Sequence, residues 1–425
     1  MKLFRVMAVC VFLKYAYCGF LYYPIMDDYI QYGTYNFFTP YHVFFEMGAA
    51  TTRPAAAFFD YYIWANLPFM VSVIIIAAAH FASAVFIYRV LEFLGARPSA
   101  LFFAVYLLLP TVSEAVFWLS ASTRIIGGMF FASAAAYALI HKKRVVFLVL
   151  FLLSCWFYEQ AAVFSAIFSS CIYFKNKKVP IIPIVGILIT GAYYILMKDV
   201  GNFSLRLTPE VGAAETSMNI LRTYGKPLWG ILKNGFVRGL FLCFKKPLFL
   251  AGIIFAAFFT AKYAPKRTNP HILFILGAVL FLASYFPFFI SGGNWISLRA
   301  GFVPAAGLAI MAGGIHSKRA AGLLVCAFLI INTTECYDYM KAGEYDFRIT
   351  QEIAGRSEDV MVIPKNHTTT YKYHEHIESI TAADWSLKGA MYYTNKIPPQ
   401  NYSVYTPEKN AEVFDGENFL WYIKE

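Results

Sequence analysis

The chain has 425 residues, of which 59% are hydrophobic and only 14% are charged, and its formal net charge is +11. Soluble globular domains carry about 25% charged residues, so this composition excludes one large soluble core and favours lipid as the main solvent. The positive net charge does not indicate a nucleic-acid partner, because the basic residues stand in short clusters between apolar runs.

Apolar segments follow one another along the chain, and each is predicted to be a membrane-spanning helix. The first is expected to remain as an uncleaved span, because Lys14 interrupts it and no A-x-A cleavage site follows. The run from 145 to 174 is too long for one ordinary span, so two short helices that turn near Glu159 are expected. The predicted spans are 5–25, 67–91, 99–119, 124–140, 145–158, 160–174, 180–197, 247–261, 271–290, 300–315 and 320–332.

Short basic clusters between these spans predict the topology. If the N-terminus is inside, every short basic loop falls on the cytoplasmic side, as the positive-inside rule requires. The predicted fold is an all-α polytopic membrane protein of about eleven transmembrane helices, multi-pass in an inner or plasma membrane. The basic loops are 89–97, 141–144, 175–178, 262–267 and 316–319.

Three longer polar segments then face outward. Residues 26–66 and 198–246 are outer loops of a transmembrane domain that we place at 1–332. Residues 333–425 form an extracytoplasmic C-terminal segment, predicted to be a small α/β domain from its β-type run at 360–363, or else an extended segment on the membrane face. The basic excess of 198–246 favours an anionic lipid phosphate nearby, with snorkelling towards ordinary headgroups as the alternative.

The most informative feature is the pair Asp27-Asp28, directly after the first predicted span. Two adjacent carboxylates at a membrane boundary repel each other, so they are typical of a general base, a metal ligand or a cation partner. A carboxylate within hydrogen-bond reach of a hydroxyl deprotonates it when its pKa is not far below the working pH. A solvated pair that ends the helix is the alternative interpretation.

Further charged residues fall at the predicted outer ends of spans. Ionisable groups at such depth usually face a water-filled cavity or one another. Opposite charges from separate helices at one membrane face predict a pocket for a phosphate and an acceptor, because a guanidinium donates two bonds to phosphate at once. Structural ion pairing, for example of Glu114 with Arg124, is the alternative. The residues concerned are Glu114, Arg124, Glu159 and Arg299.

The first outer loop continues through Thr51-Thr52-Arg53-Pro54 to Asp60, and with these motifs the chain resembles the GT-C superfamily of membrane glycosyltransferases. It is most similar to bacterial members that glucosylate O-antigen and other surface glycans, in which an Asp-Asp-Tyr motif precedes an Arg-Pro segment and another Asp. The resemblance covers residues 5–315, and Tyr158 stands at a turn where many members carry a lysine.

The resemblance implies an inverting transferase that moves a sugar from a polyprenyl-phosphate carrier to a glycan or lipid acceptor on the outer membrane face. It implies Asp27 or Asp28 as the catalytic base, and membrane lipids as further partners. No cofactor is expected, with a divalent metal at Asp27 and Asp28 as the alternative. The substrate and phosphate contacts are expected to come from Arg53, Asp60, Glu114, Arg124, Glu159 and Arg299.

Two other functions on lipid-linked saccharides stay open. A transporter or flippase predicts internal repeats and ionisable residues near the middle of the bilayer, whereas no repeat is evident and most ionisable residues fall at one face. A polymerase predicts arginine-rich outer loops, which 198–246 partly fits. The sequence contains no G-x-x-x-x-G-K-[ST] phosphate loop, so no nucleotide-sugar site is expected.

Overall fold

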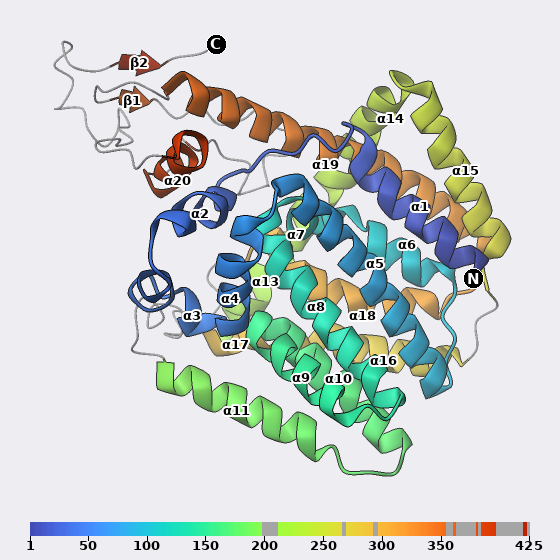
Figure 1. The fold of residues 1–425 in the computed structure, drawn as a ribbon. Coiled ribbons are helices and arrows are strands. Elements are labelled where there is room, and N and C mark those ends of the chain that lie inside the picture. Colours follow the sequence, from blue (N-terminus) through green and yellow to red (C-terminus); the bar gives the residue numbers. More distant parts are fainter. Residues whose placement is uncertain are drawn as a thin grey trace.

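The computed structural model describes residues 1–197, 211–265, 269–291, 296–353, 360–362, 380, 384–396 and 420–422. Most of these residues lie in helices, and the long helices pack side by side while several short ones gather at one end (Figure 1).

The helices of residues 1–197 alternate between long apolar ones and short irregular ones. In chain order they are α1 Lys2–Ala16, α2 Asp28–Tyr32, η1 Thr34–Phe37, η2 His42–Glu46, α3 Ala49–Thr52, α4 Pro54–Tyr62, η3 Trp64–Asn66, α5 Phe69–Leu94, α6 Ala100–Leu108, η4 Pro110–Val112, α7 Glu114–Phe117, α8 Leu119–Ile140, α9 Arg144–Phe157, α10 Glu159–Lys175 and α11 Ile181–Met197.

The described part of the second half continues with helices and two three-residue strands. These elements are α13 Ala213–Gly230, η6 Ile231–Gly235, α14 Phe236–Phe244, α15 Pro247–Tyr263, α16 Pro270–Ala283, α17 Phe286–Ser291, η7 Leu298–Gly301, α18 Phe302–Gly313, α19 Lys318–Ile353, β1 Val360–Val362, α20 Asp384–Asn395 and β2 Leu420–Tyr422.

Four helical segments in the described residues are long and apolar enough to cross a membrane. Most other predicted spans coincide with shorter apolar helices, and α1 has only 15 residues where a span over 5–25 was expected. The structure therefore supports an all-α membrane protein with four helices of spanning length, where the sequence predicted about eleven. The four segments are Phe69–Leu94, Leu119–Ile140, Pro270–Ile290 and Lys318–Gln351.

The third predicted span, 99–119, is not one helix. Helix α6 ends at Leu108, and Leu109 adopts φ −55° and ψ 117° before Pro110. A residue that precedes proline is disfavoured in the helical conformation, and proline has no N–H to continue the hydrogen-bond ladder. The short elements η4 and α7 therefore stand between α6 and α8, and they bring Glu114 to the end of the bundle.

The hairpin near Glu159 is confirmed. Helix α9 ends at Phe157, Tyr158 is extended with φ −159° and ψ 131°, and α10 begins at Glu159. Helix α19 is one helix of 36 residues that runs through residue 332, where the sequence places the end of the transmembrane domain. In the C-terminal segment, the described regular structure consists of the second half of α19, helix α20 and the strands β1 and β2, which pair in parallel.

Several basic loops of the described chain, or residues next to them, lie near one another at one end of the bundle. Lys175 donates to the Phe93 carbonyl, Ser99 N–H donates to the Gly313 carbonyl at 2.9 Å, and the Lys2 ammonium lies 5.5 Å from the Tyr263 ring. Helix α8, with 22 residues, runs from the other end to the 141–144 loop and separates the two ends by about 33 Å.

Candidate active site

The Asp27-Asp28 pair lies at the start of α2, and its two carboxylates have different surroundings. The Asp28 side chain is 0% exposed, and its Oδ1 accepts a hydrogen bond of 2.6 Å from the Ser120 N–H in the first turn of α8. Its Oδ2 accepts one of 3.2 Å from the Ile25 N–H. Asp27 is half-buried, so it is the more exposed member of the pair.

Burial raises the pKa of Asp28 from 3.8 to about 7, although the bonds from Ser120 and Ile25 favour the ionised form. The negative charge of Asp27 acts in the same upward direction. The first turn of a helix has N–H groups without helical partners, so the start of α8 is a suitable place for this carboxylate. The buried Asp28 carboxyl therefore gains and loses its proton near neutral pH.

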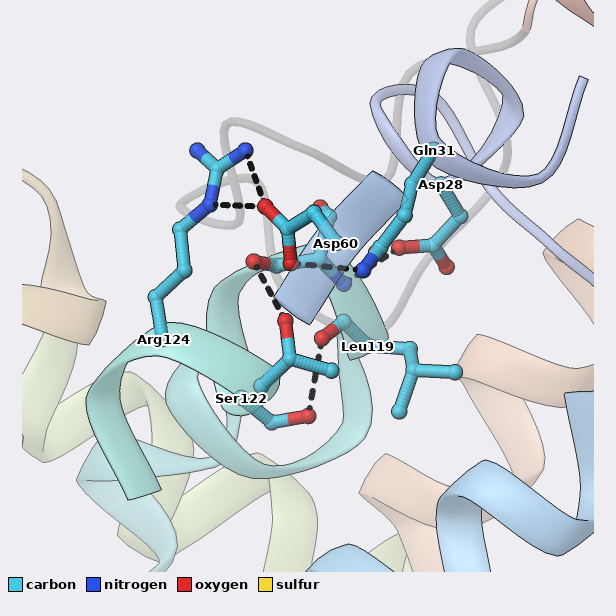
Figure 2. Close-up of polar contacts among 8 residues, drawn as sticks. Asp28, Gln31, Asp60, Leu119, Ser122 and Arg124 are labelled. Atoms are coloured by element: carbon cyan, nitrogen blue, oxygen red, sulfur yellow. Dashed lines mark hydrogen bonds and ion pairs between the residues drawn. The ribbon is translucent and has the colours of Figure 1, made fainter. Parts of the chain in front are cut away.

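Asp60, from α4, connects α2 to α8 (Figure 2). Its Oδ1 accepts a hydrogen bond of 2.8 Å from Gln31, and its Oδ2 accepts bonds of 2.9 Å and 2.8 Å from Nε and a terminal nitrogen of Arg124. Burial raises the pKa of Asp60, while the charge of Arg124 opposes that rise. The negative charge of Asp27 also acts on Arg124, so Asp27 and Asp60 share this one cation.

A second charged pair joins the first outer loop to the turn between α9 and α10. Arg53 donates to the two carboxylate oxygens of Glu159, with Nε–Oε1 at 3.0 Å and a terminal nitrogen–Oε2 at 2.9 Å. The guanidinium carbon lies 4.7 Å from the centre of the Tyr158 ring. The Tyr158 ring therefore supports the arginine that precedes α4.

Arg299 and Glu114 meet through the backbone of η7. The Arg299 N–H donates to Glu114 Oε2 at 2.8 Å, and its guanidinium carbon lies 4.4 Å from the Trp118 ring. The sequence left open an ion pair of Glu114 with Arg124, but Arg124 pairs with Asp60. Glu114 therefore orients the start of η7, from which Arg299 extends.

Two tyrosines connect these charged groups into one site. Tyr339, in α19, is within electrostatic reach of Asp28, Glu114 and Arg299. Tyr158 is within reach of Arg53, Glu159, Glu114 and Arg299. All of the predicted site residues therefore gather at one end of the bundle, although they come from α2, α4, α7, α8, α10, η7 and the residues just before α2 and α4.

Sequence reasoning missed a buried polar chain beneath this site. Lys14 donates to the Leu107 carbonyl at 2.9 Å and interacts electrostatically with Glu335 of α19. Glu335 Oε2 accepts a hydrogen bond of 2.5 Å from Ser113, the residue before Glu114. The sequence signal for such a buried chain is a charged residue within an apolar segment. Lys14 carries this signal, whereas Glu335 falls in the predicted C-terminal segment and does not.

Two cations of the basic outer loop bond to other parts of the protein. Residues 198–210 lie outside the described part of the chain, whereas Arg238 pairs with Asp338 at 3.0 Å and Lys246 donates to the Tyr17 carbonyl at 2.6 Å. These two cations therefore bind other parts of the protein. Within the described ranges, no group of three or more His, Cys, Asp or Glu side chains is arranged to hold a metal ion.

Comparison with protein-family models, with curated proteins and with solved structures finds no match for this chain. The fold and the site define a class: an all-α chain with four helices of membrane-spanning length and a cluster of acids and arginines at one end.

Proposed function

We propose that the chain is a membrane glycosyltransferase of the GT-C type, which transfers a sugar from a polyprenyl-phosphate carrier to a glycan or lipid acceptor. The observation that carries the proposal is an acidic pair, with Asp28 buried against α8 and Asp27 more exposed, grouped with Arg53, Arg124 and Arg299. The same proposal includes about eleven membrane-crossing segments in a plasma membrane, with the basic loops inside and this site outside.

In the proposed reaction Asp27 is the base, because it is the more exposed carboxylate, and Asp28 anchors the motif to α8. Asp27 takes the proton of the acceptor hydroxyl, and the oxygen forms a bond to the anomeric carbon of the donor. The bond between that carbon and the carrier phosphate breaks, and polyprenyl phosphate leaves with the electron pair. Attack on the face opposite to the phosphate inverts the anomeric centre.

The arginines suit the departing phosphate. Arg53 and Arg124 each bond a carboxylate, yet their side chains remain 21% and 32% exposed. A guanidinium has five N–H donors in a fixed plane, so the donors left over from Glu159 and Asp60 can bind phosphate oxygens. Because the acids also hold these side chains in place, the positive charge is ready before the phosphate leaves.

The test is sugar transfer by the purified protein in lipid nanodiscs, with a radiolabelled polyprenyl-phosphate hexose as donor. Asp27→Asn keeps the shape of the side chain but cannot accept the proton, so kcat should fall by about 10²–10⁴-fold. Glu46→Gln is the matched control, since Glu46 is an exposed acid of the same loop that pairs locally with His42. Unchanged turnover in both Asp27→Asn and Asp28→Asn would exclude the acidic pair as the base.

One observation favours a transporter of lipid-linked saccharides as a second candidate. Lys14 and Glu335 are buried charged residues within the bundle, and ionisable residues inside a membrane domain commonly mark transport paths. A transporter would move a fluorescent polyprenyl-phosphate saccharide between leaflets of a proteoliposome without cleaving it. Release of polyprenyl phosphate that depends on Asp27 is expected only of the transferase.

A further inference from the structure

Helix α2 has two faces, and each contacts a different part of the chain. Asp28 and Gln31, three positions apart, share the face that bonds Ser120 of α8 and Asp60 of α4. Tyr29 and Gly33, four positions apart, share another face, and it meets α20 of the C-terminal segment (Figure 1). The motif with the acidic pair is thus held between α8 and an element more than 350 positions away in the sequence.

Glycines allow the closest approach of α2 and α20. A Cβ added at Gly33 would collide with the Gly389 carbonyl oxygen, and one added at Gly389 would lie 2.6 Å from the Tyr29 carbonyl oxygen and 2.9 Å from its carbon. These are backbone atoms, which cannot move aside as a flexible side chain does. Any side chain at position 389 therefore has to push α20 away from α2.

Side chains seal the contact around these glycines. The Tyr29 side chain is fully buried, and its ring packs edge-on against Tyr393 with centroids 5.8 Å apart. Phe37, just beyond α2, stacks on Tyr392 at 4.5 Å. The buried cluster around Tyr29 also contains Ile349, Ile380, Leu387, Ala390 and Met391.

Helix α2 has only five residues, so it depends on such contacts. Helices shorter than about 12–15 residues are marginal in water, because the first turn orders several residues for a single hydrogen bond. The bonds of Asp28 and Gln31 hold one face of α2, and the Tyr29 cluster holds the other. Without α20, the second of these supports is lost, and only the bonds of Asp28 and Gln31 hold α2 against α8 and α4.

We propose that α20 is the positioning element of the acidic motif: it docks on α2 through the Gly33–Gly389 contact and holds Asp27 and Asp28 against the first turn of α8. The docking of α20 on α2 does not depend on the proposed function, whereas its consequence for sugar transfer rests on that function. The C-terminal segment is thus required for the site, although the acidic pair and the arginines all come from residues before 300.

Backbone amide exchange tests the docking directly. In Gly389→Val the exchange of a peptide covering residues 26–37 should rise about tenfold or more, while the exchange of α5 and α10 stays unchanged. The control is Lys388→Val, which places the same β-branched side chain at the neighbouring, exposed position of α20. In this variant the amide exchange of the 26–37 peptide should be as slow as in the unmodified chain.

Wild-type protection of residues 26–37 in Gly389→Val would overturn the proposal. If that variant loses protection throughout, the milder Leu387→Ala decides instead, because it only removes a buried side chain from the Tyr29 cluster. A rise confined to residues 26–37 supports the docking, and no rise there contradicts it.

Transfer kinetics then test the consequence for the reaction. Gly389→Val should lower kcat by about tenfold or more, because a small displacement of a catalytic group has a large effect on rate. The KM for the polyprenyl-phosphate sugar should change by less than about threefold, since Arg53 and Arg299 lie on other elements. Equal loss in Lys388→Val would contradict the positioning role. If the unmodified chain transfers no sugar, the proposed function fails, while the exchange result still decides the docking.

Discussion

The two ends of the bundle use charge in different ways. At the end with the basic loops, charged groups bond locally or to backbone: Arg89 and Arg97 both bond Glu92, each at 2.9 Å, and Lys175 bonds a carbonyl. At the site end, charged side chains bond across the fold, with partners 64 to 185 positions apart in the sequence. Local charge is sufficient to orient a chain in a membrane, whereas a site requires opposite charges from separate elements.

The largest expected effect is a difference in the side of the membrane that each end of the bundle faces. If the basic loops are cytoplasmic, Lys142→Cys should react with a membrane-impermeant maleimide only after cell lysis. Lys396→Cys, which is exposed beyond α20, should react in intact cells, because the site end is then outside. The parent chain, which contains seven native cysteines, is the control for background labelling. Labelling of Lys142→Cys in intact cells would reverse the proposed orientation.

Ion pairs at the two ends should differ in their contribution to stability. Arg124→Ala leaves the carboxylate of Asp60, 1% exposed, without its cation, and should lower the free energy of unfolding by about 3–5 kcal/mol. Arg97→Ala at the basic end removes an exposed pair and should change it by less than about 1 kcal/mol. Thermal unfolding in detergent measures both. Similar shifts for the two variants would remove the distinction between the ends.

The pH dependence of stability should also originate at the site end. Folding raises the pKa of Asp28 from 3.8 to about 7, so the native state binds this proton more tightly than the unfolded state does. The stabilisation of the native state by this proton is complete below about pH 4. It is lost as pH rises to about 7, so the free energy of unfolding falls by roughly 2–4 kcal/mol over that range. In Asp28→Asn this slope should disappear from unfolding curves measured between pH 4 and 8. If stability still falls with rising pH in Asp28→Asn, the pH dependence originates from another group.

A smaller effect is expected from replacing arginine by lysine. Arg53→Lys keeps the charge but loses the second bond to Glu159 and the planar contact with Tyr158, so kcat/KM should fall by about tenfold. Arg144→Lys makes the same replacement in an exposed basic loop and should leave kcat/KM unchanged. Equal activity of Arg53→Lys and the unmodified chain would show that Arg53 acts as a point charge only.

Several features of the fold could be predicted because they depend on neighbouring residues. The turn at Tyr158 and Glu159 followed from a run too long for one span, and the apolar segments mostly became helices. The end of helix α6 before Pro110 also has a local cause, although the apolar run predicts one span over 99–119. The length of α19 could not be predicted, because its second half is polar and lacks the apolar run that marks a span, whereas in the fold α19 packs against α20, η6 and α14.

By itself, the sequence determined where the chain is apolar, where its basic loops stand and which charged residues are candidates for a site. These follow from composition and from the short-range periodicity of side chains. Only the tertiary structure decided that Asp60 pairs with Arg124, that Glu159 pairs with Arg53 and that α20 covers α2. The physical reason is that such contacts depend on how whole helices are rotated and packed, and residues far apart in the chain carry no local signal of that arrangement.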